Sequence, residues 1–222
     1  MTRVIVLRPE PGASATVARA RALGLDAISL PLFEVRPVAW TAPDPAGLDA
    51  LLLTSANAVR HGGVGLDALR ALPVHAVGEA TAEAARAAGF TIAGSGTGGV
   101  DTLLESLSPQ LRLLHLCGED RRIPSGSPQK IVTIPVYRSR AIDPAPDLER
   151  ASGAVVLIHS PRAAQRFADL IEDRGTIRIA AISDATAEAA GAGWREIHVA
   201  PEPGDDALLA LAARLCNTSP PQ

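Results

Sequence analysis

A junction between a β-strand and an α-helix occurs twice in this chain, at an offset of 105 residues. Residues 77–85 read VGEATAEAA and residues 182–190 read ISDATAEAA. Each copy follows an apolar, β-branched run and precedes a glycine and an aromatic residue, which is typical of a strand, a tight turn and a helix N-terminus. The strand-like runs before Ser55 and Ser160 form a second pair at the same offset. Four matched junctions favour an internal duplication, although alanine-rich α/β segments can resemble one another without one.

These junctions have two possible uses. Ser160 followed by Pro161 has the chemistry of an N-cap and a first helical residue, so the hydroxyl can cap its own helix. The free N–H groups at a helix N-terminus also attract anions, because they carry a partial positive charge and point outward. From the residues alone, capping and carboxylate binding both remain open.

Two proline-bracketed segments, 31–37 and 135–140, are a further matched pair. Both read proline, apolar residues and an aromatic, and both are expected to be extended rather than helical. Paired as two strands they would form a narrow bridge and allow a cleft of variable width. The chain therefore predicts an α/β fold with two similar lobes, each a parallel five-stranded sheet flanked by helices, joined by a two-stranded bridge.

Composition excludes several classes of protein. The chain has 222 residues, 47% hydrophobic and 20% charged, which suits a globular protein, and its net charge of −3 argues against nucleic-acid or membrane-surface binding. Cys117 and Cys216 form no metal-binding or CxxC spacing, so we expect reduced thiols, no metal and a cytoplasmic location. No signal peptide or membrane span is expected. The glycine-rich residues 61–65 lack the ending of a phosphate loop.

The positive charge is almost wholly arginine, since Lys130 is the only lysine. An arginine fork suits planar carboxylates, which makes an anionic substrate attractive. Codon bias towards arginine explains the same composition equally well. This feature therefore decides nothing by itself.

An ordered set of short motifs resembles the uroporphyrinogen-III synthase family. The set is Arg8-Pro9, Thr54-Ser55-x-Asn57-Ala58-Val59, Ala76-Val77-Gly78-x-x-Thr81-Ala82, Pro135-Val136-Tyr137-Arg138, Ser160-Pro161, and Ala185-Thr186-Ala187 before Gly193-Trp194. Each motif alone is only a strand-to-helix turn or an extended segment. Their order, which covers nearly the whole chain, is what carries the resemblance.

The resemblance implies a discontinuous domain arrangement that the repeat itself does not establish. Lobe 1 would comprise 1–33 and 138–222, lobe 2 would comprise 38–133, and the bridge would comprise 34–37 and 134–137. It also implies a cofactor-free, monomeric lyase of porphyrin and heme biosynthesis. Such an enzyme cyclises the linear tetrapyrrole hydroxymethylbilane to uroporphyrinogen III, with inversion of the last pyrrole ring and loss of water.

The resemblance also implies roles for particular residues. Tyr137 would be the catalytic proton donor; the alternative is a packing aromatic paired with Phe33. The substrate-binding residues would be Arg8, Thr54, Ser55, Asn57, Gly78, Thr81, Ser160, Ser183 and Thr186. No metal or other cofactor is expected, and neither nucleic acid nor membrane is an expected partner. The substrate would pass to this chain by transient hand-over from the preceding pathway enzyme.

The chain departs from the family pattern at three places. Cys117 stands where an arginine is expected, the helix after Arg121 is cut short, and Ser183 replaces the glycine of the first junction copy. These departures weaken individual site assignments more than the family resemblance. A different class of function stays open, namely a non-catalytic two-lobed cytosolic protein that binds a small polyanionic ligand.

Overall fold

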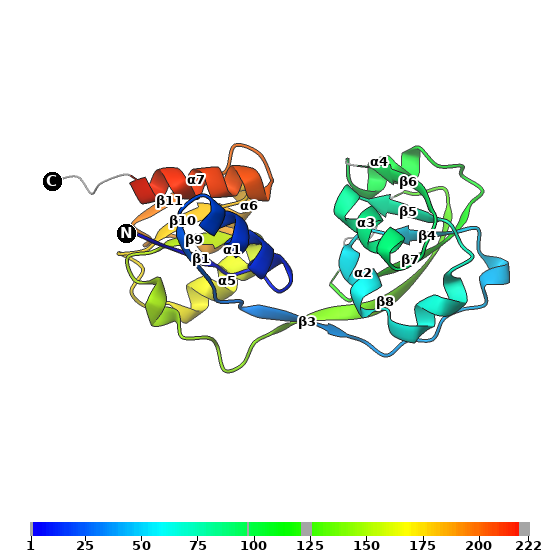
Figure 1. Cartoon of the computed structure of the whole chain (residues 1–222), viewed down its shortest axis with the longest axis horizontal. Coiled ribbons are helices and arrows are strands. Elements are labelled where there is room, and N and C mark those ends of the chain that lie inside the picture. The colour runs from blue at the N-terminus through cyan, green and yellow to red at the C-terminus, as the bar shows by residue number, and fades with distance from the viewer. Residues whose placement is uncertain (1, 97, 121–125, 218–222) are drawn as a thin grey trace. The chain divides into compact units, whose positions relative to one another are not determined.

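The computed structural model describes residues 2–96, 98–120 and 126–217, and in it the chain divides into two compact units (Figure 1). Unit 1 comprises Met1–Glu34 together with Arg140–Gln222, and unit 2 comprises Val35–Ser139. The chain leaves unit 1 within strand β3 (Phe33–Pro37) and returns to it within strand β8 (Lys130–Ala141). Both units are of the α/β class, as the sequence predicts.

Unit 1 is built on a five-stranded sheet in which every pair of neighbouring strands is parallel. Its strand order is β11-β10-β9-β1-β2. The strands are β1 (Arg3–Val6), β2 (Asp26–Ser29), β9 (Val155–Ile158), β10 (Arg178–Ala181) and β11 (Glu196–Val199). The three central strands are almost continuously apolar and buried, because helices cover both faces of a parallel sheet. The predicted five-stranded parallel sheet is confirmed here.

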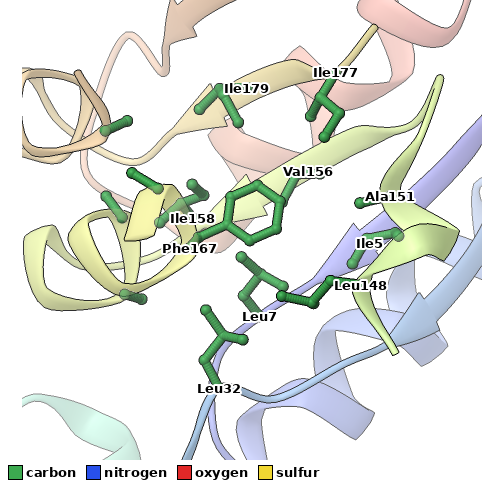
Figure 2. Close-up of a cluster of buried hydrophobic side chains, with 14 of the residues drawn as sticks. Ile5, Leu7, Leu32, Leu148, Ala151, Val156, Ile158, Phe167, Ile177 and Ile179 are labelled. Atoms are coloured by element: carbon green, nitrogen blue, oxygen red, sulfur yellow. The ribbon is translucent and has the colours of Figure 1, made fainter. Parts of the chain in front are cut away.

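Two hydrophobic clusters cover the two faces of this sheet. Helices α1 (Gly12–Ala22) and α7 (Asp205–Asn217) pack on one face, through residues such as Val17 and Leu208. Helices α5 (Pro161–Leu170) and α6 (Asp184–Ala190), with the 3₁₀ turn η3 (Leu148–Ala151), pack on the other. Phe167 of α5 lies at the centre of that second cluster, among Leu7, Val156 and Ile158 (Figure 2).

Unit 2 contains a six-stranded sheet of order β3-β8-β7-β4-β5-β6. Its strands other than β3 and β8 are β4 (Ala50–Leu53), β5 (Val74–Val77), β6 (Ile92–Gly96) and β7 (Arg112–Gly118). Neighbours from β8 to β6 are parallel. Beside β3, Val38 N donates to Val136 O and Ile142 N donates to Leu32 O, at 3.0 Å each, so residue numbers rise along one segment as they fall along the other. That pattern is antiparallel.

The five strands predicted for the second lobe are parallel, but the prediction that they form the whole sheet is wrong, because β3 adds a sixth, antiparallel strand. The physical reason is that β8 runs without a break from Lys130 to Ala141, through the segment expected to be a separate bridge strand. The free edge of β8 is then paired by β3. The two segments predicted as a bridge are thus part of the second sheet.

The helices of unit 2 lie mainly on one face of its sheet. Helices α2 (Ala56–His61) and α3 (Glu79–Ala87), with the 3₁₀ turns η1 (Pro45–Gly47) and η2 (Gly63–Leu69), connect strands along the chain. The hydrophobic cluster between the sheet and α2, α3 and η2 includes Leu51, Leu69, Ala82 and Phe90. Helix α4 (Gly99–Glu105) packs on the opposite face against Leu52 and Leu113. The described residues of the 119–129 segment contain no helix, and the shortened helix expected after Arg121 falls on residues 121–125, outside the description.

The duplication predicted from the 105-residue offset is visible in the strand order. Read from one edge, unit 1 runs β11-β10-β9-β1-β2 and unit 2 runs β6-β5-β4-β7-β8 before β3 is added. Ser55 caps α2 and Ser160 caps α5 at matching positions after β4 and β9. Gly78 and Ser183 precede α3 and α6 in the same way. Each unit therefore places its matched junctions at the carboxyl edge of its sheet.

Two local features of unit 2 involve glycine. Residues 94–96 belong to β6, because backbone pairing with β5 outweighs the low strand propensity of glycine. Helix α4 starts at Gly99, so Asp101 lies in its first turn. Within the described ranges, no helix is both long and apolar enough to cross a membrane.

An ion pair at the amino ends of β4 and β7 makes the stability of unit 2 pH-dependent. The Asp49 carboxylate accepts hydrogen bonds from Nε, Nη2 and the backbone N–H of Arg112, at 2.7–3.1 Å. The side-chain bonds from Arg112, and to a smaller extent its backbone bond, lower the pKa of Asp49 from 3.8 to about 2. Because the folded-state pKa is depressed, the stabilisation is fully present above pH ~4 and is lost as the pH falls towards 2.

We therefore expect Asp49→Asn to unfold at lower urea concentration than the wild type at pH 7, with a difference that shrinks below pH 4. Carbon-detected NMR titration of the Asp49 carboxyl gives the pKa directly. In Arg112→Gln the same titration is expected near the ordinary value. A wild-type pKa that matches the one in Arg112→Gln would contradict this assignment.

Candidate functional site

The first junction of unit 2 follows β4 and carries three of the predicted binding residues. Ser55 is the N-cap of α2 and its Oγ accepts from Asn57 N at 3.2 Å. Thr54 Oγ1 lies 3.1 Å from Nε2 of His115, a buried histidine on the neighbouring strand β7. The Asn57 side chain accepts from Arg60 at 3.3 Å. The structure thus brings Thr54, Ser55 and Asn57 together at one strand end.

The duplicated junctions at Gly78 and Ser183 are built differently. Gly78 has φ of 82°, a conformation that L side chains rarely adopt, and an added Cβ would meet no atom within 4 Å. Ser183 has an extended backbone, and its Oγ accepts from Thr186 N at 3.4 Å. The Ser183 side chain therefore caps the N-terminus of α6. At Gly78 no side chain caps α3, so the first N–H groups of that helix stay available to other acceptors. The departure noted in the sequence is a real difference in turn geometry.

Thr81 and Thr186 lie beneath these turns instead of on their surface. Thr186 is fully buried, with Oγ1 3.0 Å from Ser183 Oγ, and Thr81 is 5% exposed. The Thr186 hydroxyl is therefore placed to support the start of α6, and Thr81 occupies the corresponding buried position in α3. For Thr186 this is the capping alternative that the sequence left open, whereas Gly78 and Ser183 are only partly buried.

Ser160 has the clearest capping geometry in unit 1. Its backbone is extended and its Oγ accepts from Ala163 N at 3.2 Å, with Pro161 at the first helical position of α5. Ser160 is half-buried at the carboxyl end of β9. This junction matches the expectation from the Ser-Pro dipeptide. Its amide groups face the carboxyl edge of the sheet, where ligands of parallel α/β sheets bind.

Arg8 follows β1, the neighbour of β9 in the sheet, and belongs to a charged cluster centred on Asp205. Arg8 Nη1 lies 3.3 Å from Thr16 Oγ1 and 3.5 Å from Asp205 Oδ1. The Asp205 carboxylate also accepts from Thr16 Oγ1 at 2.9 Å and from Arg19 Nη1 at 2.8 Å, and it lies 2.9 Å from His159 Nε2. Four side chains, two from α1 and one from each of the ends of β1 and β9, therefore converge on one carboxylate.

The surroundings of Asp205 keep it ionised. Its partial burial alone would raise the pKa, but the hydrogen bonds from His159 and Thr16 and the charges of His159 and Arg8 outweigh that effect. The pKa of Asp205 is consequently below its ordinary value. Arg8 keeps about a third of its side chain exposed, so its guanidinium remains available at the surface.

Tyr137 lies on β8 opposite Gly118 of β7, where the register of the two strands shifts. Its ring is half-buried against the α2 face of unit 2, 6.2 Å from the ring of His61 at the end of α2. A Cβ on Gly118 would lie 2.8 Å from the Tyr137 ring, so glycine leaves the space the ring occupies. Phe33 instead packs in a cluster of unit 1, with the Arg162 guanidinium 4.5 Å above its ring. The ring neighbour of Tyr137 is thus His61.

One hollow of unit 2 adjoins His61, the ring neighbour of Tyr137. Its volume is about 370 Å³, and Trp40 and the glycine-rich residues 62–65 also line it. A larger hollow of about 520 Å³ in unit 1 is lined by Leu148, Ile171 and Ile177. Ile177 precedes β10, so this hollow lies at the amino end of that strand, away from the junctions. It contains none of the predicted site residues.

Sequence reasoning missed four residues near the predicted site residues: His61 at the end of α2, His115 within β7, His159 after β9 and Asp205 at the start of α7. The signal for His159 was its place between the end of β9 and the cap Ser160. The signal for Asp205 was an acidic residue at the start of a helix. Their mutual contact joins residues 46 positions apart, which no local pattern can indicate.

The fold and the junctions define a class of protein: duplicated parallel α/β units whose strand ends carry hydroxyls, helix amides and an arginine suited to carboxylates. The family model described as "Uroporphyrinogen-III synthase HemD" matches residues 14–210. The chain therefore belongs to the uroporphyrinogen-III synthase family, as its motifs predict.

Solved structures agree with this assignment at the level of the fold. The uroporphyrinogen-III synthetase of Helicobacter pylori is 20% identical, with a TM-score of 0.68 over 97% of this chain and 100% of that one. A mutant uroporphyrinogen III synthase of Thermus thermophilus is 18% identical, with a TM-score of 0.53 over 98% and 100%. No curated protein matches the chain in sequence.

Proposed function

We propose that this protein is a uroporphyrinogen-III synthase, which cyclises hydroxymethylbilane to uroporphyrinogen III with inversion of the last pyrrole ring and loss of water. The observation that carries the proposal is the family match, which spans 14–210 and so includes almost all of both units. The family assigns the enzyme to tetrapyrrole biosynthesis. The match does not favour the alternative of a non-catalytic protein that binds a polyanion.

The strand ends fit the substrate because it is a flexible polycarboxylate. We propose that carboxylates bind at Arg8, at the turns of Thr54, Ser55 and Asn57, and at the turns of Gly78, Ser160 and Ser183. Helix amides and an arginine fork are the donors that such groups need. Thr81 and Thr186, being buried, would take part by holding their turns in shape. Fixing the substrate in one conformation then selects the carbon that attacks.

Tyr137 is the proposed proton donor. A pyrrole nitrogen lone pair can expel the terminal hydroxyl and leave an azafulvenium electrophile, and a proton delivered to the departing hydroxyl makes it leave as water. The Tyr137 hydroxyl is the phenol that this chain offers, since it is the only tyrosine. Attack by the substituted carbon of the last ring, followed by bond migration and loss of a proton, then gives the inverted product. Each of these steps uses only substrate atoms and a proton.

The finer parts of the proposal follow from the same resemblance. The protein would be a cofactor-free lyase of the cytoplasm that receives its substrate by transient hand-over from the preceding enzyme. Its lobes would be 1–33 with 138–222, and 38–133, hinged at 34–37 and 134–137. The chain crosses between the two units within β3 and within β8, and this supports a hinge at these segments.

The direct test supplies purified protein with hydroxymethylbilane and separates the uroporphyrin isomers after oxidation. We expect isomer III to dominate, whereas the buffer blank gives the uninverted isomer I by spontaneous closure. Product no richer in isomer III than the blank would rule out the synthase activity and return the polyanion-binding alternative.

Ser160 offers a way to separate capping from substrate binding. Replacing an N-cap serine by glycine costs only a few tenths of a kcal/mol, whereas replacement by alanine costs about 1 kcal/mol. We expect Ser160→Gly to leave the urea midpoint nearly unchanged and yet raise KM for hydroxymethylbilane several-fold, since a hydrogen bond to a charged group is lost. A normal KM in Ser160→Gly would restrict this hydroxyl to capping.

A further inference from the structure

The side chains around Asp205 hold two neighbouring strand ends together. His159 follows β9, Arg8 follows β1, and β9 and β1 are hydrogen-bonded neighbours in the sheet of unit 1. Asp205 is the first residue of α7 and reaches both side chains, at 2.9 Å from His159 Nε2 and 3.5 Å from Arg8 Nη1. One carboxylate therefore ties α7 to both strand ends.

The members of this cluster are satisfied to different degrees. Asp205 is the most fully satisfied, since Thr16, Arg19 and His159 are all at hydrogen-bonding distance from its two oxygens. The His159 side chain is 9% exposed, and its Nδ1 has no hydrogen-bond partner among the described residues. The ring is thus oriented through Nε2 and Asp205. Arg8, in contrast, is 35% exposed, and its contacts here are the single bond to Thr16 and the longer ion pair.

This difference suggests that Asp205 and Arg8 have separate roles. Arg19 pairs with Asp205, and His159 lies at hydrogen-bonding distance from it, so Asp205 can orient the Arg8 guanidinium without using all of its N–H groups. His159 also directly precedes Ser160, whose turn is a proposed carboxylate site. Gly12 lies against Arg8, where an added Cβ would come within 2.5 Å of Nε, so the arginine is confined on that side as well.

We propose that Asp205 is a positioning residue for substrate binding: through His159 and Arg8 it fixes two adjacent strand ends so that Arg8 presents its free N–H groups to a substrate carboxylate. This inference rests on the proposed function and adds a residue that does not itself touch the substrate. It assigns Arg8 the binding contact and Asp205 the control of its geometry.

Because Asp205 is acidic, its replacement distinguishes a positioning role from a simple effect of net charge. If only net charge mattered, removing an acidic residue near an anion site would tighten the binding of a polycarboxylate. The positioning role has the opposite sign, because Arg8 loses its orientation. We expect Asp205→Asn to weaken binding about tenfold, the scale of one lost charge-assisted hydrogen bond.

Asp206 provides the matched control. It is the next residue of α7, its side chain is 95% exposed, and it pairs with Arg19. Asp206→Asn makes the same change in net charge and is expected to leave binding unchanged or slightly tighter. Asp205→Glu, which keeps the carboxylate, is expected to recover most of the lost affinity. In an Arg8→Ala background, Asp205→Asn should have little further effect, because residues that act through one another are not additive.

The experiment measures Kd for uroporphyrinogen III, kept reduced under nitrogen, by isothermal titration calorimetry at a temperature where circular dichroism shows every variant folded. Weaker binding in Asp205→Asn alone, with rescue by Asp205→Glu, supports the inference. Unchanged or tighter binding in Asp205→Asn, or an equal additional loss in the Arg8→Ala background, overturns it. A wild type that binds uroporphyrinogen III but makes no excess of isomer III would instead overturn the proposed function and leave this inference standing.

Discussion

Tyr137→Phe is expected to lower kcat for the formation of uroporphyrinogen III about 100-fold, the lower range for removal of a general acid. The substitution keeps the ring that packs beside His61 and removes only the hydroxyl. KM should change little, because carboxylate binding is assigned to other residues. The measurement is the initial rate of cyclisation with the product isomers separated, so that spontaneous closure is subtracted.

Trp40→Phe is the matched control for this prediction. Trp40 packs against the same hydrophobic cluster, and its Nε1 donates to Gly62 O at 2.8 Å, so this variant also removes one polar group from an aromatic ring. It should keep kcat near the wild-type value. Wild-type turnover in Tyr137→Phe, with folding intact, would remove the phenol from the mechanism and leave it a packing role.

Phe167→Ala is expected to destabilise unit 1 by about 3–5 kcal/mol, the usual range for a buried phenylalanine. Phe167 is fully buried at the centre of the cluster in Figure 2. It also stacks on Trp194, with ring centroids 5.3 Å apart and an interplanar angle of 7°. The loss therefore combines apolar burial, a cavity and an aromatic pair.

The two tryptophans allow this change to be measured in one unit. Trp194 belongs to unit 1 and Trp40 to unit 2, so urea unfolding followed by fluorescence in a Trp40→Phe background reports Trp194 alone. Leu23→Ala, at a position 59% exposed, is the surface control and should change the unfolding free energy by less than about 0.5 kcal/mol. A loss in Phe167→Ala no larger than in Leu23→Ala would contradict the assigned core.

Local chemistry explains what could be predicted from the sequence. Ser55, Ser160 and Ser183 are N-caps in the structure because a short hydroxyl side chain after an apolar strand accepts a bond from the next helical turn. The buried strands of unit 1 are equally local, since β-branched and apolar runs favour a sheet covered on both faces. The 105-residue repeat indicates which junctions of the two units correspond.

Long-range contacts explain what could not be predicted. The length of β8 and its pairing with β3 depend on which strand edge is free, which is a property of the assembled sheet. The burial of Thr81 and Thr186 depends on the packing of their helices. The approach of Asp205 to His159 and Thr16 joins segments 46 and 189 positions apart. Chemical type alone marked these residues as polar, without indicating their partners.

A crystal structure of the protein with uroporphyrinogen III bound under anaerobic conditions tests the central claim most directly. The account predicts product carboxylate oxygens within hydrogen-bonding distance, about 2.7–3.2 Å, of the Arg8 guanidinium and of the backbone or hydroxyl donors at Ser55, Gly78, Ser160 and Ser183. Product carboxylates held elsewhere, with these strand-end donors facing only water, would contradict it.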